Sequence, residues 1–128
     1  MKFLLDTHTF LWWDSEPAKL SPQVLTSCQD RANAVLLSVA SAWEMQIKLQ
    51  LGKLKLNMSL AELIESQRRT NNIEMLPVAL PHVLALQNLP SHHKDPFDRL
   101  LIAQANVEGA VLLSNDSIFA KYSVQLLW

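Results

Sequence analysis

Residues 2–9 read KFLLDTHT, an apolar run that stops abruptly at an acidic residue. Four more apolar runs follow along the chain, at residues 34–37, 73–78, 110–113 and 124–127. These runs are nearly continuous rather than alternating, which indicates strands that are covered on both faces, as in a parallel sheet. The pattern therefore predicts five strands, the first over residues 2–5.

The segments between these runs carry helical spacing and helix end signals. Residues 39–51 have apolar side chains on one face and stop at Gly52, and Ser59 can cap a helix that continues to about Thr70. Pro96 suits the first position of another helix. Shorter helical segments are expected at residues 22–31 and 81–89. Strands that alternate with helices predict an α/β fold with a mainly parallel sheet, in one domain over residues 1–128.

Composition excludes several classes of protein. With 49% apolar residues and two glycines in 128, the chain is neither a disordered tail nor a linker. Cys28 is the single cysteine, which leaves no intramolecular disulfide and suits a reducing compartment. No run of about 18 apolar residues occurs, so no membrane span is expected and the protein should be cytoplasmic. A net charge of −1 argues against a sequence-independent DNA coat, but not against a nuclease.

Five acidic residues stand where an apolar run ends or where a helix should begin: Asp6, Glu44, Asp95, Asp98 and Asp116. Ligands of parallel α/β sheets bind outside the carboxyl ends of the strands, so acids at these ends can share one site. Clustered carboxylates repel one another, and a divalent cation offsets that repulsion. Carboxylate oxygens suit Mg²⁺ or Mn²⁺ rather than zinc, and the pattern indicates such a metal site.

Three of these acids also have a local structural explanation. Asp6 and Asp116 fit turn or helix-cap positions. Glu44 lies three residues after Ser41, which matches a capping box. A helix capped by Ser38 would instead place Glu44 about one turn further in, where it no longer serves as a cap partner. The sequence leaves both readings of Glu44 open.

The other two acids belong to the helix that starts at Pro96. Asp95 is best explained as the N-cap of this helix, because Pro96 then takes the first helical position. Asp98 falls at the third helical position, where a carboxylate gains from the helix dipole, and a metal-binding role is favoured for Asp98 over Asp95. On the earlier helix, Lys48 is placed to pair with Glu44 four residues before it.

Histidines and tryptophans are interpreted as structural. Residues 92–95, HHKD, suggest zinc, but the chain lacks the usual four-ligand spacing, and a solvated loop is predicted instead. His8 and His82 are expected to make local hydrogen bonds. Three tryptophans are predicted to pack in the core: Trp12, Trp13 and Trp43. Trp128 is assigned to the surface or to an interface.

Four segments together resemble the PIN domain, and most closely the VapC-like toxins of type II toxin–antitoxin systems. They are LLDTHT at 4–9, LSVASAWEM at 37–45, HKDPFDRLLIAQA at 93–105 and LSND at 113–116. The resemblance implies a compact three-layer α/β/α fold around a central, mainly parallel sheet. It also implies an endoribonuclease that uses Mg²⁺ or Mn²⁺ to hydrolyse RNA phosphodiester bonds.

The resemblance further assigns roles to particular residues. The family's acidic quartet, with catalytic and metal-binding roles, carries over to Asp6, Glu44, Asp98 and Asp116. Auxiliary roles fall to Asp95, Thr7 and Ser114. Implied partners are an RNA substrate, a cognate antitoxin protein and a second copy of the chain in a homodimer.

Two alternative functions remain open at this point. A phosphoacceptor-type signalling domain also gathers acids at strand ends, although Ser38 stands where its middle-strand aspartate would be sought. A PIN-fold binding module without activity is the other alternative, and the complete acidic quartet argues against it.

Overall fold

A five-stranded parallel sheet forms the centre of the computed structural model, which describes all residues from 1 to 128. The strand order is β3-β2-β1-β4-β5, and every neighbouring pair is parallel. The strands are β1 (Lys2–Leu5), β2 (Ala34–Ser38), β3 (Glu74–Leu76), β4 (Val111–Leu113) and β5 (Leu126–Leu127). The prediction of five parallel strands is confirmed, although β3 and β5 are shorter than the apolar runs that contain them.

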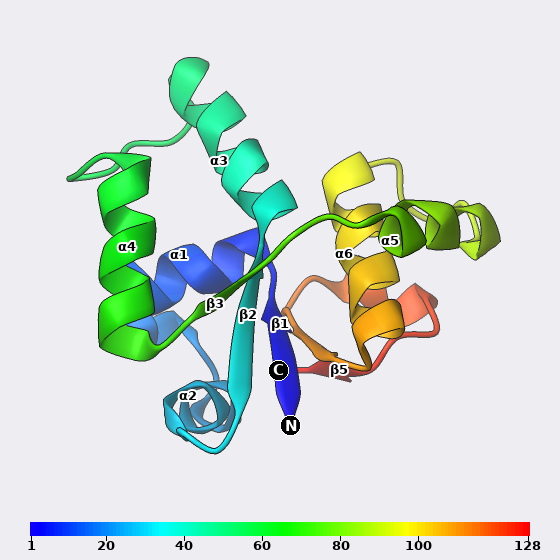
Figure 1. Ribbon diagram of the computed structural model, residues 1–128, viewed down its shortest axis with the longest axis horizontal. Coiled ribbons are helices and arrows are strands. Elements are labelled where there is room, and N and C mark those ends of the chain that lie inside the picture. The colour runs from blue at the N-terminus through cyan, green and yellow to red at the C-terminus, as the bar shows by residue number, and fades with distance from the viewer.

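Helices cover both faces of this sheet (Figure 1). The α-helices are α1 (Thr7–Ser15), α2 (Pro22–Gln29), α3 (Val39–Gln50), α4 (Leu60–Asn71), α5 (Leu80–Ala85) and α6 (Pro96–Glu108). Three short 3₁₀ helices are η1 (Pro17–Lys19), η2 (Leu86–Asn88) and η3 (Ser117–Lys121). Figure 1 shows α1, α2 and α4 on one side of the sheet and α5 and α6 on the other, with α3 beyond the carboxyl end of β2. The predicted α/β/α layering is confirmed.

The two faces of the sheet pack into two separate apolar cores. Phe3 and Leu5 of β1 lie in the core beneath α1, α2 and α4, whereas Leu4 between them faces α6. Strands β2 and β4 divide their side chains between the two cores in the same way. Each fully buried leucine or phenylalanine contributes roughly 1.5–3 kcal/mol of transfer free energy. Because both faces are covered, the residues inside the three central strands are apolar, and polar residues stand only at strand ends, at Lys2 and Ser38.

The start of α3 settles the two readings of Glu44. Ser38 is the N-cap, and its Oγ accepts a hydrogen bond from the N–H of Ala40 at 3.0 Å. Glu44 therefore lies beyond the first turn of α3, and the capping box with Ser41 does not form. With Ser38 as the cap, Glu44 is not a helix-end residue, and its side chain is buried at the carboxyl edge of the sheet.

Two sequence predictions about α2 and α3 need correction. Trp43 is 63% exposed, not part of the core, and its ring packs edge-on against Phe97 with centroids 5.3 Å apart. Helical spacing identified one apolar face of α3, but the elements around α3 leave Trp43 uncovered. Helix α2 ends at Gln29 instead of residue 31. Trp13 is buried as predicted, and Trp12 is half-buried against the ring of Trp128.

No helix in the structure has the length and apolarity that a membrane crossing requires.

Candidate metal centre

A polar pocket of about 210 Å³ opens beside the carboxyl ends of β1 and β4. None of its lining residues is hydrophobic: Asp6, Thr7, His8, Glu44, Lys48, His93, Asp95, Asp98 and Asp116. All five acids that the sequence singled out are therefore brought together. They come from four different places in the chain: the end of β1, helix α3, the cap and first turn of α6, and the turn after β4.

Asp6 is both a helix cap and a wall of the pocket. Its Oδ1 accepts a hydrogen bond from the N–H of Thr9 at 2.8 Å, and its own N–H donates to the carbonyl of Leu113 at 3.2 Å. The residue is only 5% exposed. Burial raises the pKa of the Asp6 carboxyl, and the hydrogen bonds from Ser114 and Thr9 oppose that rise only in part.

Glu44 has both carboxylate oxygens occupied by neighbouring side chains. The hydroxyl of Thr7 donates to Oε1 at 2.7 Å, and Lys48 Nζ lies 2.9 Å from Oε2. The predicted pairing of Lys48 with Glu44 is confirmed. Because Thr7 follows Asp6 directly, this hydrogen bond ties α3 to the end of β1.

Asp95 and Asp98 share the first turn of α6. As predicted, Asp95 is the N-cap, and its Oδ1 accepts the N–H groups of Phe97 at 2.9 Å and Asp98 at 3.4 Å. The pKa of Asp98 is raised to about 6, mainly by burial; the His93 hydrogen bond opposes the rise, and the charges of Asp95 and Glu44 add to it.

Asp116 is the most accessible of the five acids. It is exposed, and its Oδ1 accepts the N–H of Ile118 as the N-cap of η3 at 3.1 Å. The N–H of Asp116 donates to Ser114 Oγ at 3.1 Å. Ser114 is buried and also hydrogen-bonds the Asp6 carboxylate, so it connects the two strand-end aspartates.

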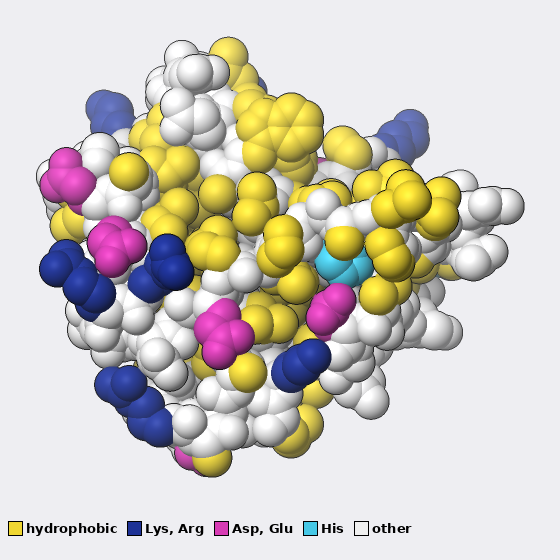
Figure 2. Space-filling model, viewed as in Figure 1, with side chains coloured by type: hydrophobic (Ala, Val, Ile, Leu, Met, Phe, Trp, Pro, Cys, Tyr) yellow, Lys and Arg dark blue, Asp and Glu magenta, His cyan; other side chains and the backbone are white.

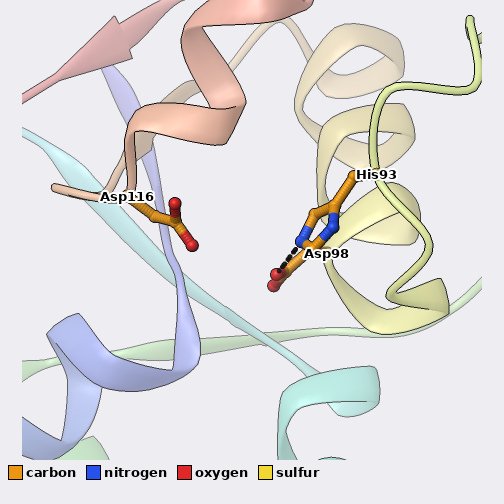
Figure 3. A group of neighbouring side chains, drawn as sticks. All are labelled: His93, Asp98 and Asp116. Carbon is orange, nitrogen blue, oxygen red and sulfur yellow. Dashed lines mark hydrogen bonds and ion pairs between the residues drawn. The ribbon is translucent and has the colours of Figure 1, made fainter.

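His93 is the residue that sequence reasoning misplaced. Residues 92–95 were predicted to form a solvated loop, but the His93 ring is half-buried and its Nε2 lies 2.8 Å from Asp98 Oδ2. One possible ligand atom from each of His93, Asp98 and Asp116 lies within 4.8 Å of the other two. Figure 3 shows these three side chains facing one another across the pocket. Zinc-ligand spacing along the chain carries no information about the contact between His93 and Asp98, because that contact forms only when the chain folds.

Of the other two histidines expected to make local hydrogen bonds, His82 does so and His8 does not. His82 is buried, and its Nδ1 accepts the N–H of Ala79 at 2.9 Å, a local hydrogen bond as predicted. Its Nε2 also lies 2.9 Å from Glu108 on α6, a longer-range contact that the sequence did not reveal. His8 is exposed and lines the pocket, with its ring 5.8 Å from that of Trp12.

The side chains of the pocket fit a divalent cation. They offer carboxylate oxygens from five acids and no thiolate, which is the donor chemistry that Mg²⁺ and Mn²⁺ accept. Two of the carboxyls, Asp6 and Asp98, have raised pKa values because burial removes water from them. A nearby positive charge offsets such a desolvation penalty.

Comparisons with known proteins identify the family of the chain. A sequence model of the PIN domain matches residues 3–125. Ribonuclease VapC22 of Mycobacterium tuberculosis is 31% identical over 119 residues, which cover 88% of this chain and 85% of that protein.

Two solved structures have a similar fold at low sequence identity. VapBC2 from Rickettsia felis, bound to a DNA fragment from its promoter, has a TM-score of 0.76 at 16% identity, covering 99% of this chain and 98% of that chain. VapBC-1 from nontypeable Haemophilus influenzae has a TM-score of 0.64 at 16% identity, covering 99% and 97%. With the sequence match over nearly its whole length and an α/β/α fold that gathers the acids at one edge, the chain belongs to the PIN domain family.

Proposed function

We propose that this chain is an endoribonuclease that hydrolyses RNA phosphodiester bonds with Mg²⁺ or Mn²⁺. The observation that carries the proposal is the convergence of Asp6, Glu44, Asp98 and Asp116 on one pocket without a hydrophobic residue. Membership of the PIN domain family and the similarity to ribonuclease VapC22 support the same reaction class.

The four acids have distinct roles in this proposal. Asp6 and Asp116 hold the principal ion, because they end the neighbouring strands β1 and β4 and are connected through Ser114. Glu44 and Asp98 complete the binding shell or orient the attacking water. When bound, the cation lowers the pKa of a water molecule and offsets negative charge on the phosphodiester. Thr7 and Ser114 hold carboxylates in place, and Asp95 fixes the first turn of α6.

Positive side chains next to the pocket suit a phosphate backbone. Lys48 lines the pocket, and Lys94 is exposed between two other lining residues, His93 and Asp95. Lysine contacts to phosphate position a nucleic acid without reading its sequence. We propose that these two lysines help RNA approach a site that is otherwise negatively charged.

The proposal is tested with purified protein and labelled single-stranded RNA, with Mg²⁺ or Mn²⁺ and with a chelator. We expect cleavage that requires the metal and is lost in Asp6→Asn by a factor of about 10² or more, because an amide is a poor metal ligand. Glu65→Gln, an exposed carboxylate-to-amide change on α4, is the matched control and should cleave normally. Metal-dependent cleavage that survives in Asp6→Asn would contradict the assignment.

We also propose that the chain is the toxin of a toxin–antitoxin pair. The similarity of its fold to the VapBC structures supports a protein partner. An antitoxin segment laid across the pocket could present an arginine to the carboxylates as a bidentate, charge-assisted contact. Co-purification with the product of the adjacent gene, and inhibition of RNA cleavage by it, test this role. If that product neither binds nor inhibits, the toxin assignment fails while the nuclease assignment stands.

A homodimer is proposed from the surface of the molecule. Figure 2 shows apolar side chains gathered over α3, the chain after β3, and α5. Exposed members of this apolar surface include Val39, Trp43, Leu80, Val83 and Leu84. Contiguous apolar surface of this kind marks protein interfaces. Light scattering should give twice the chain mass, and Leu84→Lys should shift it to the monomer; a monomeric wild-type protein would contradict the proposal.

A further inference from the structure

His93 lines the pocket but does not belong to the acidic quartet. His93 is half-buried, and its Nε2 lies 2.8 Å from Asp98 Oδ2. Across the pocket, Asp116 completes a group whose three ligand atoms lie within 4.8 Å of one another. In Figure 3 the imidazole and both carboxylates face the same space between the start of α6 and the start of η3. The arrangement offers a cation one nitrogen and several oxygens.

The loop that carries His93 is fixed in place by a buried tyrosine. The hydroxyl oxygen of Tyr122 accepts the N–H of His93 at 2.8 Å and the N–H of His92 at 3.1 Å. Tyr122 is 6% exposed and directly follows η3, the same short helix that Asp116 caps at its other end. The positions of His93 and Asp116 are therefore set by one element, so these two side chains are held in register before any ligand binds.

We propose that His93 is a nitrogen ligand of the metal site, together with Asp98 and Asp116, and that it makes the site favour Mn²⁺ over Mg²⁺. The inference rests on the proposed metal-dependent function and deepens it. Mg²⁺ binds almost wholly through oxygen, whereas imidazole is a good ligand for first-row transition metals. An imidazole among carboxylates therefore stabilises bound Mn²⁺ more than bound Mg²⁺.

The test uses Mn²⁺ itself as the probe. Pulsed electron paramagnetic resonance of the full chain loaded with Mn²⁺ detects a nitrogen atom bound directly to the ion through its echo modulation. We expect the nitrogen signal in the wild-type protein and its loss in His93→Gln. His92→Gln is the matched control, because the neighbouring His92 ring is exposed and packs on Tyr122 instead of entering the pocket. His92→Gln should keep the signal.

Calorimetry supplies a second readout. In His93→Gln the dissociation constant for Mn²⁺ should rise by at least about tenfold, the lower bound for residues that only orient ligands. The dissociation constant for Mg²⁺ should rise by a smaller factor. Tyr122→Phe changes no residue of the pocket but removes the hydroxyl that holds the His93 loop, and it should weaken Mn²⁺ binding in the same direction.

The outcomes separate this inference from the proposed function. Wild-type protein that binds Mn²⁺ without a nitrogen signal overturns the His93 assignment, and metal-dependent RNA cleavage would still stand. A nitrogen signal that persists in His93→Gln also overturns it. The absence of the signal from the wild-type spectrum is decisive even if His93→Gln fails to fold. Wild-type protein that binds neither Mn²⁺ nor Mg²⁺ overturns both the inference and the proposed function.

Discussion

At the scale of single residues, the pocket is held in shape by hydrogen bonds from the chain to its own carboxylates. Asp6 and Asp116 each accept a backbone N–H as helix caps, and Asp98 is held by His93. Glu44 is held at both oxygens. Partners of this kind fix the direction of a ligand atom and so reduce the entropy lost when an ion binds.

The Thr7 hydroxyl gives the sharpest test of this arrangement. Thr7→Val keeps the side-chain shape but leaves Glu44 Oε1 without its donor, so metal affinity should fall by about 10- to 100-fold in calorimetry. Stability should fall by about 1–3 kcal/mol, since a buried acceptor loses its partner. In Thr26→Val, where the hydroxyl bonds only the carbonyl of Pro22 in its own helix, metal affinity should not change. Equal affinities in all three proteins would show that Thr7 does not orient Glu44.

Capping and pocket placement are not alternatives for Asp6 and Asp116. Each caps a helix through one oxygen and also lines the pocket. The sequence indicated the capping roles of these two residues, because a cap depends on residues two or three positions away. The position of His93 depends on Tyr122, which is 29 residues away, and no local pattern records that contact.

At the scale of elements, the first turn of α6 combines a structural and an electrostatic task. Asp95→Ala removes the cap and should lower the free energy of unfolding by about 1 kcal/mol in chemical denaturation. Asp95→Asn keeps a capping oxygen but removes the charge that helps to raise the pKa of Asp98. In the metal-free Asn variant, the Asp98 carboxyl should therefore titrate below about 6 by NMR. A pKa that stays the same or rises would contradict the electrostatic role of Asp95.

The elements themselves were predictable to different degrees. Helix starts at Ser59 and Asp95 were located correctly because capping and an adjacent proline are local signals. The edge strands were not, because a strand extends only as far as its partner pairs with it. Strand β3 pairs with β2 over three residues and is followed by Pro77, which has no N–H for the ladder. Periodicity predicted which face of α3 is apolar, but it did not predict which elements cover that face. The prediction that Trp43 lies in the core was therefore wrong.

At the scale of the whole molecule, the pocket carboxylates set the pH dependence of stability. The pKa of Asp98 rises from 3.8 to about 6 on folding, so its stabilising contribution is full below pH 3.8 and is lost as pH rises through 6. In a chelator, Asp98→Asn should therefore gain stability relative to the wild-type protein between pH 4 and pH 7, by up to about 3 kcal/mol. Thermal unfolding across this range measures the difference; a constant difference would contradict it.

Cys28 reports on the opening of the fold as a whole. It is buried in α2, and burial raises the pKa of its thiol to about 12, so the reactive thiolate is scarce at pH 8. A thiol reagent should label the native protein only through unfolding. Saturating Mn²⁺ should slow that labelling in the wild-type protein by mass action, but much less in Asp6→Asn. Labelling at the rate of a free thiol in the native protein would contradict the burial.

The order of the strands has a consequence for the timing of synthesis. Of the five strands β1 is made first, yet it lies between β2 and β4, and β4 is made only after β2 and β3. The pocket combines Asp6, which follows β1, with Asp116, which follows β4 and is translated much later. A nascent chain that stops before Asp116 holds only part of the cluster. The ribosome that makes this protein is therefore not exposed to an assembled site until translation has passed Asp116.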